Sequence, residues 1–276
     1  MRLARVCSYT VTADSGFFNP LQLQPVAALR LGFNAGARWL RENVLSHRRL
    51  INEYRLGLVL WGAHLTYKEP LGFFDTDELH VRAVGRVRRD GAQFECEVDV
   101  GSAGVVAAHL RACSIPLALS GDAALSGKPA RMAAGLLAMF HADEIEPTPY
   151  VSPVVKLTRE IVKDGERVGE GNRPFRLHRH KCEVADQWFW PEISALIGCG
   201  REALILSQGE GLPELRDGLR LPIQGIDMMF TRPYYLFDRG VVCSQAYRWK
   251  NRLVFVHQLL ADDKPADVHA IAVERF

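Results

Sequence analysis

The chain has 276 residues, of which 48% are hydrophobic and 24% are charged, and its formal net charge is +2. This composition is typical of a globular protein, and the length allows one large domain or two of ordinary size. So small a net charge argues against the broad basic surface of a nucleic-acid-binding protein. Six scattered cysteines without paired spacing indicate reduced thiols. Because no apolar signal segment opens the chain and no run of apolar residues is long enough to span a bilayer, we expect a cytoplasmic protein without a membrane span.

The first half of the sequence predicts a strand, then a long helix, then an antiparallel meander. The strand is the alternating, β-branched run Val6 to Thr12. From Pro25 to Val44 apolar residues recur every three or four positions, which is the helical period, and proline suits a first helical turn. Four strands joined by turns such as Asp90-Gly91 follow at Arg55 to Tyr67, Glu78 to Arg88, Gln93 to Val100 and Val105 to Leu119.

The second half predicts the same order. An added hairpin over Val154 to Val168 and a strand over Phe175 to Cys182 precede a helix from Asp186 to Ile197, with Gly198 and Gly200 at its end. The returning strands are Ile223 to Thr231, Gly240 to Trp249, Leu253 to Leu260 and Val268 to Glu274. Between the halves, residues 142–153 contain three prolines and are typical of a linker.

An internal repeat supports this reading of two similar halves. Four residues recur 163 positions later in the same order: Gly62 and Gly225, Pro70 and Pro233, Phe74 and Phe237, and Asp75 and Asp238. A self-similar chain predicts two copies of one supersecondary unit, and functional sites are best sought where the copies meet.

Three segments carry a resemblance to a known family. GFNAGARWLRENV (residues 32–44) is similar to the central helix of hotdog thioesterases, and TYKEPLGFFDT (66–76) is similar to their second strand. FTRPYYLFD (230–238) resembles the same element in the C-terminal half of double-hotdog acyl-thioester hydrolases. The resemblance implies an α+β fold of two tandem hotdog units, 1–141 and 154–276, each a long central helix wrapped by an antiparallel sheet. It also implies a substrate that is a thioester of coenzyme A or of an acyl carrier protein.

Asp14 and Asn19 lie between the first strand and the first helix. They resemble the aspartate and asparagine of the loop that precedes the helix in hotdog thioesterases, which implies a general base or nucleophile and an orienting amide. The substrate is then expected beside the helix start at Pro25. The alternative is ordinary turn and cap chemistry, since Asp-Ser-Gly and Asn-Pro are common loop formers.

His64 and Asp227 occupy equivalent positions in the two copies, each within an otherwise apolar strand. A titratable residue there is unfavourable unless it is paired or functional, and Asp227 resembles the strand aspartate of double-hotdog acyl-CoA thioesterases. A surface-facing position is the alternative for both. Tyr67 resembles the tyrosine that some polyketide-pathway double hotdogs use for acyl transfer coupled to decarboxylation, or it is a packing aromatic.

The second half offers a further group of candidates before its helix. His178, His180 and Cys182 alternate, so on a strand they would share one face, but no fourth ligand at a recognised spacing follows and we predict no metal site. His180 and Asp186 are candidates near the helix entrance. Trp188 and Trp190 are expected to form a wall for an acyl or aromatic group, or to pack in the core.

The sequence therefore predicts an enzyme that hydrolyses an acyl thioester without a cofactor. Asp14 or Asp227 would act as base or nucleophile, and helix N-terminal amides would hold the carbonyl oxygen. The alternatives are a polyketide-type acyltransferase, decarboxylase or dehydratase, and a non-catalytic hotdog that binds acyl chains or a partner. Since two fused units can supply the pairing that single hotdogs obtain by dimerising, either a monomer or a homodimer is expected.

Overall fold

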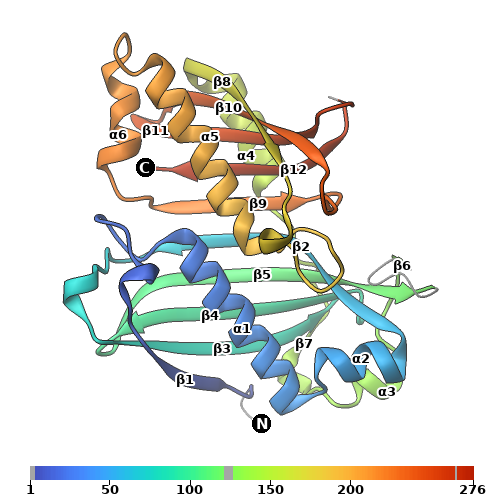
Figure 1. Ribbon diagram of the computed structural model, residues 1–276. Helices are drawn as coiled ribbons and strands as arrows, with labels where there is room; N and C mark the ends of the chain where they lie inside the picture. Colours follow the sequence, from blue (N-terminus) through green and yellow to red (C-terminus); the bar gives the residue numbers. More distant parts are fainter. Residues whose placement is uncertain (1–3, 121–126, 265) are drawn as a thin grey trace.

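The computed structural model describes residues 4–120, 127–264 and 266–276, and within them twelve strands form one continuous sheet. The strand order is β1-β3-β4-β5-β2-β9-β12-β11-β10-β8, with the short β6 and β7 at its margins. All neighbours pair antiparallel except β7, which runs parallel to β3. Helices α1 and α5 lie on one face of the sheet and α4 lies behind it (Figure 1). The predicted α+β class with a large antiparallel sheet is confirmed.

The first half closely follows the predicted elements. Its helix α1 and its four main strands begin and end within two residues of their predicted limits. The helix α2, with Ser46 as its N-cap, was not predicted. The elements are β1 (Cys7–Thr12), η1 (Ser15–Phe17), α1 (Pro25–Asn43), α2 (His47–Tyr54), β2 (Leu56–Tyr67), η2 (Phe73–Asp75), β3 (Glu78–Arg88), β4 (Gln93–Ser102), β5 (Val105–Leu119), β6 (Gly127–Pro129), α3 (Ala134–Leu137), η3 (Ala142–Glu144) and β7 (Ile145–Glu146).

The second half repeats the arrangement with some additions. It also contains short helical segments that were not predicted around residues 179–181 and 213–220. The elements are α4 (Val154–Asp164), β8 (Glu166–Arg176), η4 (Arg179–Lys181), η5 (Trp190–Glu192), α5 (Ile193–Gln208), η6 (Pro213–Arg216), α6 (Asp217–Arg220), β9 (Gly225–Phe230), β10 (Arg239–Trp249), β11 (Arg252–Ala261) and β12 (Val268–Arg275).

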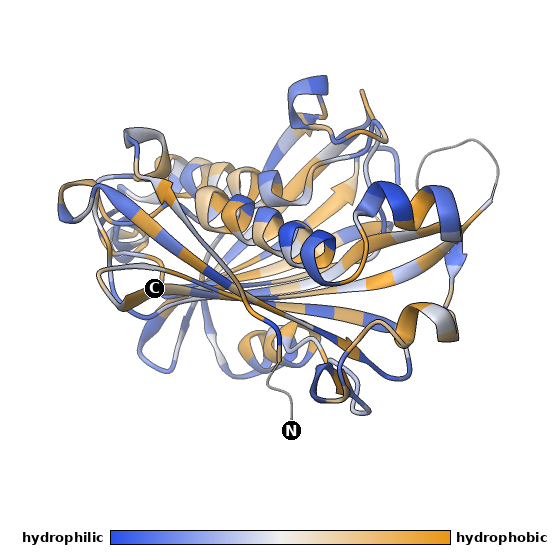
Figure 2. Ribbon diagram, turned by 90° about the horizontal axis from the view of Figure 1, so that it is seen from below, coloured by the Kyte–Doolittle hydropathy of each residue, from blue (hydrophilic) through white to orange (hydrophobic). Residues whose placement is uncertain are grey.

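The main core lies between the sheet and the two long helices. Hydrophobic and hydrophilic residues alternate along the strands (Figure 2), so that one set of side chains packs under α1 and α5. Glycines allow the helices to approach closely. A Cβ at Gly32 would lie 2.1 Å from Leu110 Cδ2, and one at Gly200 would lie 2.7 Å from Ser244 Oγ and Val242 Cγ1. A smaller core on the other face joins α4 to the second half of the sheet through Ile161.

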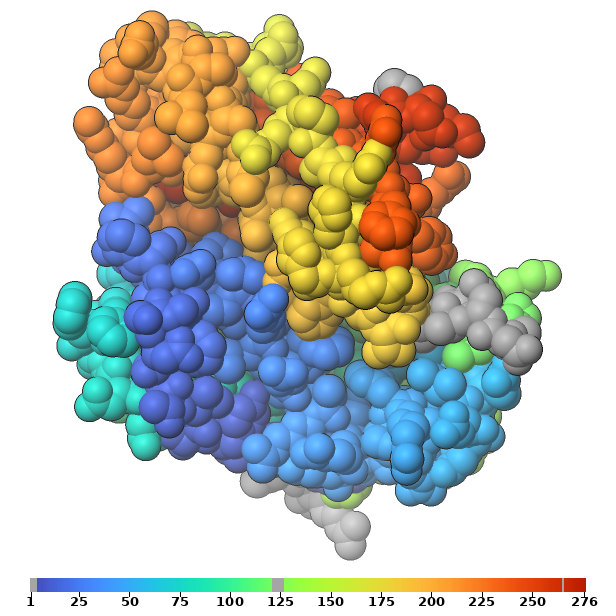
Figure 3. Space-filling view, viewed as in Figure 1, coloured from blue at the N-terminus to red at the C-terminus, as the bar shows by residue number. Residues whose placement is uncertain are grey.

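The two halves meet at the antiparallel pair β2 and β9. Its register pairs Gly62 with Met229, His64 with Asp227 and Thr66 with Gly225. His64 and Asp227 are also counterparts in the internal repeat. A residue can pair with its own counterpart only where a twofold axis passes between them, so the pseudo-twofold relation of the halves is centred on this pair. Figure 3 shows the two halves packed against each other along this seam.

The repeated Pro-x-x-x-Phe-Asp segment has a local cause. The Asp75 carboxylate accepts a hydrogen bond from the Gly72 amide at 2.7 Å, and the Asp238 carboxylate accepts one from the Tyr235 amide at 2.8 Å. Both aspartates therefore close the same turn after equivalent strands. The aromatic residue before each, Phe74 or Phe237, is exposed.

Two predictions before the second long helix are wrong. The segment Val154 to Asp164 is the helix α4 and not part of a hairpin, because Val154, Leu157 and Ile161 recur with the helical period and face the sheet. The strand predicted over Phe175 to Cys182 ends at Arg176, and residues 179–181 form a 3-10 turn. His178, His180 and Cys182 therefore do not share a strand face.

The second long helix starts later than predicted. Residues 186–189 form a loop before the helix, where the Trp188 amide donates to the Tyr234 carbonyl at 3.0 Å. The helix begins with Pro191 in its leading 3-10 turn and continues to Gln208. Gly198 and Gly200 lie in its interior, where Gly200 permits close packing rather than ending the helix.

Residues 142–153, predicted as a linker, pack against the first half. They contain η3 and β7, and the buried Tyr150 contacts the ring of Trp61 with a centroid distance of 5.9 Å. No helix within the described residues has both the length and the apolar character needed to cross a membrane.

Candidate functional site

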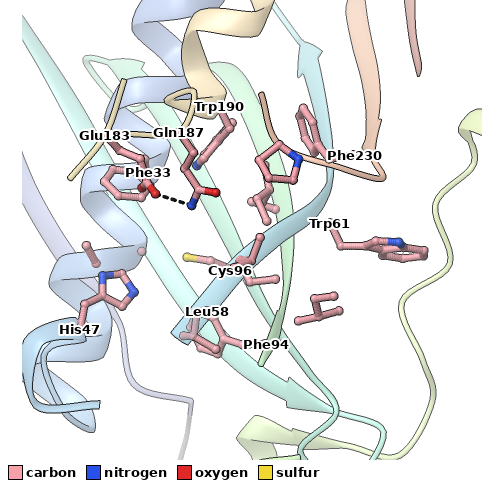
Figure 4. A pocket seen from close by; sticks show the side chains of 18 of the residues that line it. Phe33, His47, Leu58, Trp61, Phe94, Cys96, Glu183, Gln187, Trp190 and Phe230 are labelled. Atoms are coloured by element: carbon pink, nitrogen blue, oxygen red, sulfur yellow. Dashed lines mark hydrogen bonds between the residues drawn. The ribbon is translucent and has the colours of Figure 1, made fainter. Parts of the chain in front are cut away.

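A cavity of about 450 Å³ lies between the two halves. The first half contributes the side of α1 that faces the sheet, together with β2, β4 and β5. The second half contributes the loop at residues 183–190 and the end of β9 (Figure 4). Its walls are mostly apolar and aromatic, and they include Phe33, Leu40, Leu58, Phe94, Trp188, Trp190 and Phe230. A cavity of this size and character suits a small apolar group.

Small residues on α1 leave the space open. Gly32, Gly36 and Ala37 all line the cavity, and none carries a side chain beyond Cβ. The loop from the second half closes the opposite side because it is anchored at its ends. The Phe189 amide donates to the Lys181 carbonyl, and the Leu236 amide donates to the Asp186 carbonyl, both at 2.8 Å.

Contacts across the seam fix the start of the α5 segment against α1. The Arg30 guanidinium pairs with the Glu192 carboxylate. The Phe33 ring meets Phe189 edge-on at 5.1 Å and Trp190 at 6.2 Å between centroids. The start of the helical segment Trp190 to Gln208 therefore lies beside the cavity wall. Its Glu192 amide donates to the Phe189 carbonyl at 2.9 Å, its Ile193 amide donates to the Trp190 carbonyl, and Pro191 has no N–H.

The principal carboxylate in the cavity wall is Glu183. Gln187 Nε2 donates to Glu183 Oε1 at 2.6 Å (Figure 4), and the Glu183 amide donates to the Gln187 carbonyl at 2.8 Å. Burial raises the pKa of Glu183, and the hydrogen bond from Gln187 offsets only part of that rise. A carboxylate with a raised pKa and a fixed orientation has the properties of a general base.

A histidine and a cysteine also line the cavity. His47, the first residue of α2, stacks near Phe33, and burial lowers its pKa, so the ring is neutral at pH 7. Burial raises the pKa of Cys96 to about 12. Its thiol therefore remains protonated, which makes it a poor nucleophile.

The structure places Asp14 and Asn19 outside this cavity. The exposed Asp14 carboxylate accepts a hydrogen bond from the Gly16 amide at 2.7 Å as the N-cap of η1. Asn19 Oδ1 accepts from the amides of Leu21 and Gln22, both at 2.9 Å. These contacts are the turn and cap chemistry named as the alternative to a catalytic role. Pro25 begins α1 and also lies outside the cavity lining.

His64 and Asp227 are brought into direct contact, but on the sheet face opposite α1 and α5. His64 Nδ1 bonds to Asp227 Oδ1, Arg275 bonds to the other Asp227 oxygen, and His64 Nε2 lies 2.9 Å from Thr66 Oγ1. Burial, with the charges of Arg275, Arg111 and Lys68, lowers the pKa of His64 to about 4. A neutral ring then donates to the Asp227 carboxylate.

Tyr67 lies on the helix-facing side of β2, within the core. Its hydroxyl donates to the Leu23 carbonyl at 2.7 Å, and burial raises its pKa. This contact matches the alternative reading of Tyr67 as a packing aromatic.

Among the second-half candidates, Trp188 and Trp190 line the cavity. Asp186 lies outside it and pairs with Arg179 at 2.7 Å. His180 is exposed in η4, with its ring stacked at 6.2 Å from that of His178. Within the described residues, no group of three or more His, Cys, Asp or Glu side chains has the geometry of a metal site.

Sequence reasoning missed Glu183, Gln187 and His47. Glu183 and Gln187 stand in the loop that holds Trp188 and Trp190, so the tryptophans pointed to the correct segment. The assumption of a strand through Cys182 concealed the loop. His47 had no detectable signal, because it reaches the cavity only through the unpredicted helix α2.

Neither the family models nor the curated proteins include a match to this sequence. Solved structures do match over nearly the whole chain. A Lactobacillus plantarum protein described as an oleoyl thioesterase has a TM-score of 0.75 at 8% identity, covering 99% of this chain and 96% of its own. An acyl-ACP thioesterase from Bacteroides thetaiotaomicron has a TM-score of 0.69 at 11% identity, covering 98% and 97%. The 12:0-ACP thioesterase from Umbellularia californica has a TM-score of 0.68 at 9% identity, covering 98% and 93%.

At these identities the likeness establishes the fold. The chain has the same fold as these three thioesterases, the hotdog fold that the three quoted segments predicted. Over its full length the arrangement is similar to that of acyl-ACP thioesterases.

Proposed function

We propose that the protein hydrolyses an acyl thioester whose acyl group occupies the cavity between the halves. The observation that carries this proposal is the Glu183 carboxylate, half-buried in the wall of an apolar cavity and oriented by Gln187. The hotdog fold and the two tryptophans in the cavity wall support the same assignment.

In the proposed reaction Glu183 takes a proton from water, and the resulting hydroxide adds to the thioester carbonyl. Because the amides of Glu192 and Ile193 already have carbonyl partners, the Trp190 amide is the proposed donor to the oxyanion. The carbon–sulfur bond then breaks, and Glu183 returns the proton to the thiolate. The products are a carboxylic acid and a free thiol. Gln187 acts as a positioning residue for the carboxylate.

We further propose that the chain consists of two tandem hotdog units, 1–141 and 154–276, joined by residues 142–153. Each half contains one long helix against five strands, and the pseudo-twofold relation at His64 and Asp227 links them. In this arrangement the first unit forms most of the cavity, and the second unit contributes the loop that carries Glu183. One chain then holds one complete site.

The test is release of free thiol from a panel of acyl-CoA and acyl-carrier-protein thioesters. Glu183→Gln should lower kcat/KM by at least about 100-fold, the usual range for loss of a general base. Glu210→Gln is the matched control, since Glu210 is exposed and lies after α5, and it should retain wild-type activity.

Other outcomes would contradict the proposal. If Glu183→Gln kept most of the activity while Asp14→Asn or Asp227→Asn lost it, the base would be one of the residues predicted from sequence. Loss of carbon dioxide or water from an intact thioester would identify a decarboxylase or dehydratase. Tight acyl-thioester binding without any turnover would identify a non-catalytic binding protein.

A further inference from the structure

A second concave site lies on the solvent-facing side of α1. This groove has a volume of about 930 Å³ and runs between β1, α1 and the beginning of α2. Figure 3 shows this side of the molecule, with the blue residues of β1 and α1 beside the lighter blue α2. Four arginines line the groove: Arg30, Arg38, Arg41 and Arg48. We call it the arginine groove.

The arginine groove adjoins the cavity that holds Glu183. Ala37 and His47 line both spaces, so the two meet at the C-terminal part of α1 and the first residue of α2. A ligand that is apolar at one end and anionic at the other could therefore occupy both.

The charge of the groove is only partly neutralised by the protein. Arg30 pairs with Glu192, and Arg38 pairs with Glu42 at 2.7 Å. Arg41 and Arg48 are exposed, and neither forms a salt bridge with an acidic side chain among the described residues. In the part of the chain that the structure describes, Asp14 is the one acidic residue in the lining; it lies in the loop after β1, at the opposite end of the groove from Ser46 and Arg48. The end near α2 thus has an excess of positive charge.

We propose that this end of the arginine groove binds the phosphate groups of coenzyme A, with Arg41 and Arg48 as the principal contacts. The pantetheine arm then passes His47, and the acyl group enters the cavity. Guanidinium groups recognise phosphate oxygens through paired hydrogen bonds. A concave groove of this volume falls within the range of small-molecule sites, which favours coenzyme A itself over the surface of a carrier protein. The placement of the acyl group rests on the proposed hydrolase function, whereas the phosphate site does not require turnover.

The direct test is calorimetric titration of coenzyme A into the full-length protein. Arg41→Ala and Arg48→Ala should each raise Kd by about 10-fold, which corresponds to about 1.4 kcal/mol, and the double variant by about 100-fold. Binding should also weaken as salt is raised. Arg220→Ala removes an exposed arginine from α6 in the other half and should leave Kd unchanged. Equal Kd values for wild-type protein and the double variant would overturn the proposal.

A kinetic comparison separates this proposal from the hydrolase assignment. The double variant should raise KM for acyl-CoA while leaving acyl-pantetheine, which lacks the phosphates, within about 2-fold of wild type, since the missing contacts are phosphate contacts. An equal rise in KM for acyl-CoA and for acyl-pantetheine would contradict the phosphate site. Losses confined to acyl-carrier-protein substrates would assign the groove to a carrier protein and overturn the coenzyme A assignment. If no thioester were hydrolysed, the calorimetric result would still decide whether the groove binds coenzyme A.

Discussion

Replacing Arg201 with methionine should leave the Glu274 carboxylate inside the second half without its guanidinium partner and with only the hydrogen bond to His257. Arg201 Nη1 lies 2.6 Å from both Glu274 oxygens, and His257 Nε2 lies 3.2 Å from one of them. Ser244 Oγ completes the network at 2.8 Å from His257 Nδ1. Glu274 is 1% exposed and His257 is 0% exposed, so water cannot replace a lost partner.

The expected loss is large because one charge of a buried pair would remain without compensation. Such a change typically lowers the free energy of unfolding by about 3–5 kcal/mol. The loss should depend on pH in a defined direction. Burial alone would raise the pKa of Glu274, but Arg201 and His257 outweigh burial and lower it to about 2. In the wild type this pair therefore stabilises the fold above the unfolded glutamate pKa, and the contribution disappears as pH falls toward 2. In the variant the carboxyl can take up a proton, so the deficit should shrink between pH 8 and pH 5.

Urea unfolding at both pH values measures this effect. The double variant Arg201→Met/Glu274→Gln should recover much of the stability, since it removes the unpaired charge. Glu202→Gln is the control, because Glu202 is half-exposed and lies 3.7 Å from the same guanidinium; its effect should stay within about 0.5 kcal/mol. A loss below about 1 kcal/mol for Arg201→Met, or a deficit that grows at low pH, would refute the reasoning.

Three further predictions concern the cavity and the seam. Ala112→Phe should fill part of the cavity and lower kcat/KM for long acyl thioesters by at least about 10-fold relative to short ones; an unchanged chain-length profile would exclude this cavity as the acyl site. The acid limb of the kcat/KM profile should lie above the ordinary glutamate pKa, since burial raises the pKa of Glu183, and Gln187→Leu should move it higher, because the lost hydrogen bond favours the carboxylate. Asp227→Ala should reduce the free energy of unfolding by about 3 kcal/mol in urea titrations but leave kcat/KM of the folded protein within about 2-fold. A large kinetic loss there would restore Asp227 as a catalytic residue.

The sequence predicted the backbone of the first half well because its signals are local. The period of apolar residues gave α1, and alternation with turn residues gave β2 to β5. The second half was harder to read near residues 154–192. Val154, Leu157 and Ile161 satisfy a helical period, but the β-branched residues around them suggested a strand. The loop before α5 is held by long-range backbone hydrogen bonds to the β9–β10 connection, and such hydrogen bonds cannot be predicted from a local sequence pattern.

The site could be predicted only in outline. The repeat indicated that function lies where the halves meet, and Trp188 and Trp190 identified one wall of the cavity. Asp14, Asp227 and Asp186 were chosen because each is a carboxylate near a loop or within an apolar strand. Caps, turns and ion pairs satisfy that description as well as catalysis does. What distinguishes Glu183 is its half-buried position in the wall of an apolar cavity, and this position depends on tertiary packing.

The duplicated scaffold also shows why a repeat in sequence does not fix where a cavity forms. The strands β4 and β5 under α1 occupy the same places in the sheet order as β11 and β12 under α5. In the first half this space is lined by small or apolar residues and contains the cavity. In the second half Arg201, Ser244, His257 and Glu274 fill it with a hydrogen-bonded polar network. Removing one member of a buried charged network leaves another charge without its partner, which destabilises the fold. A cavity at the equivalent place in the second half would therefore require the loss of this polar network. The same backbone arrangement therefore serves different purposes in the two halves: the first half forms most of the cavity, and the second half holds the Glu183 loop against it.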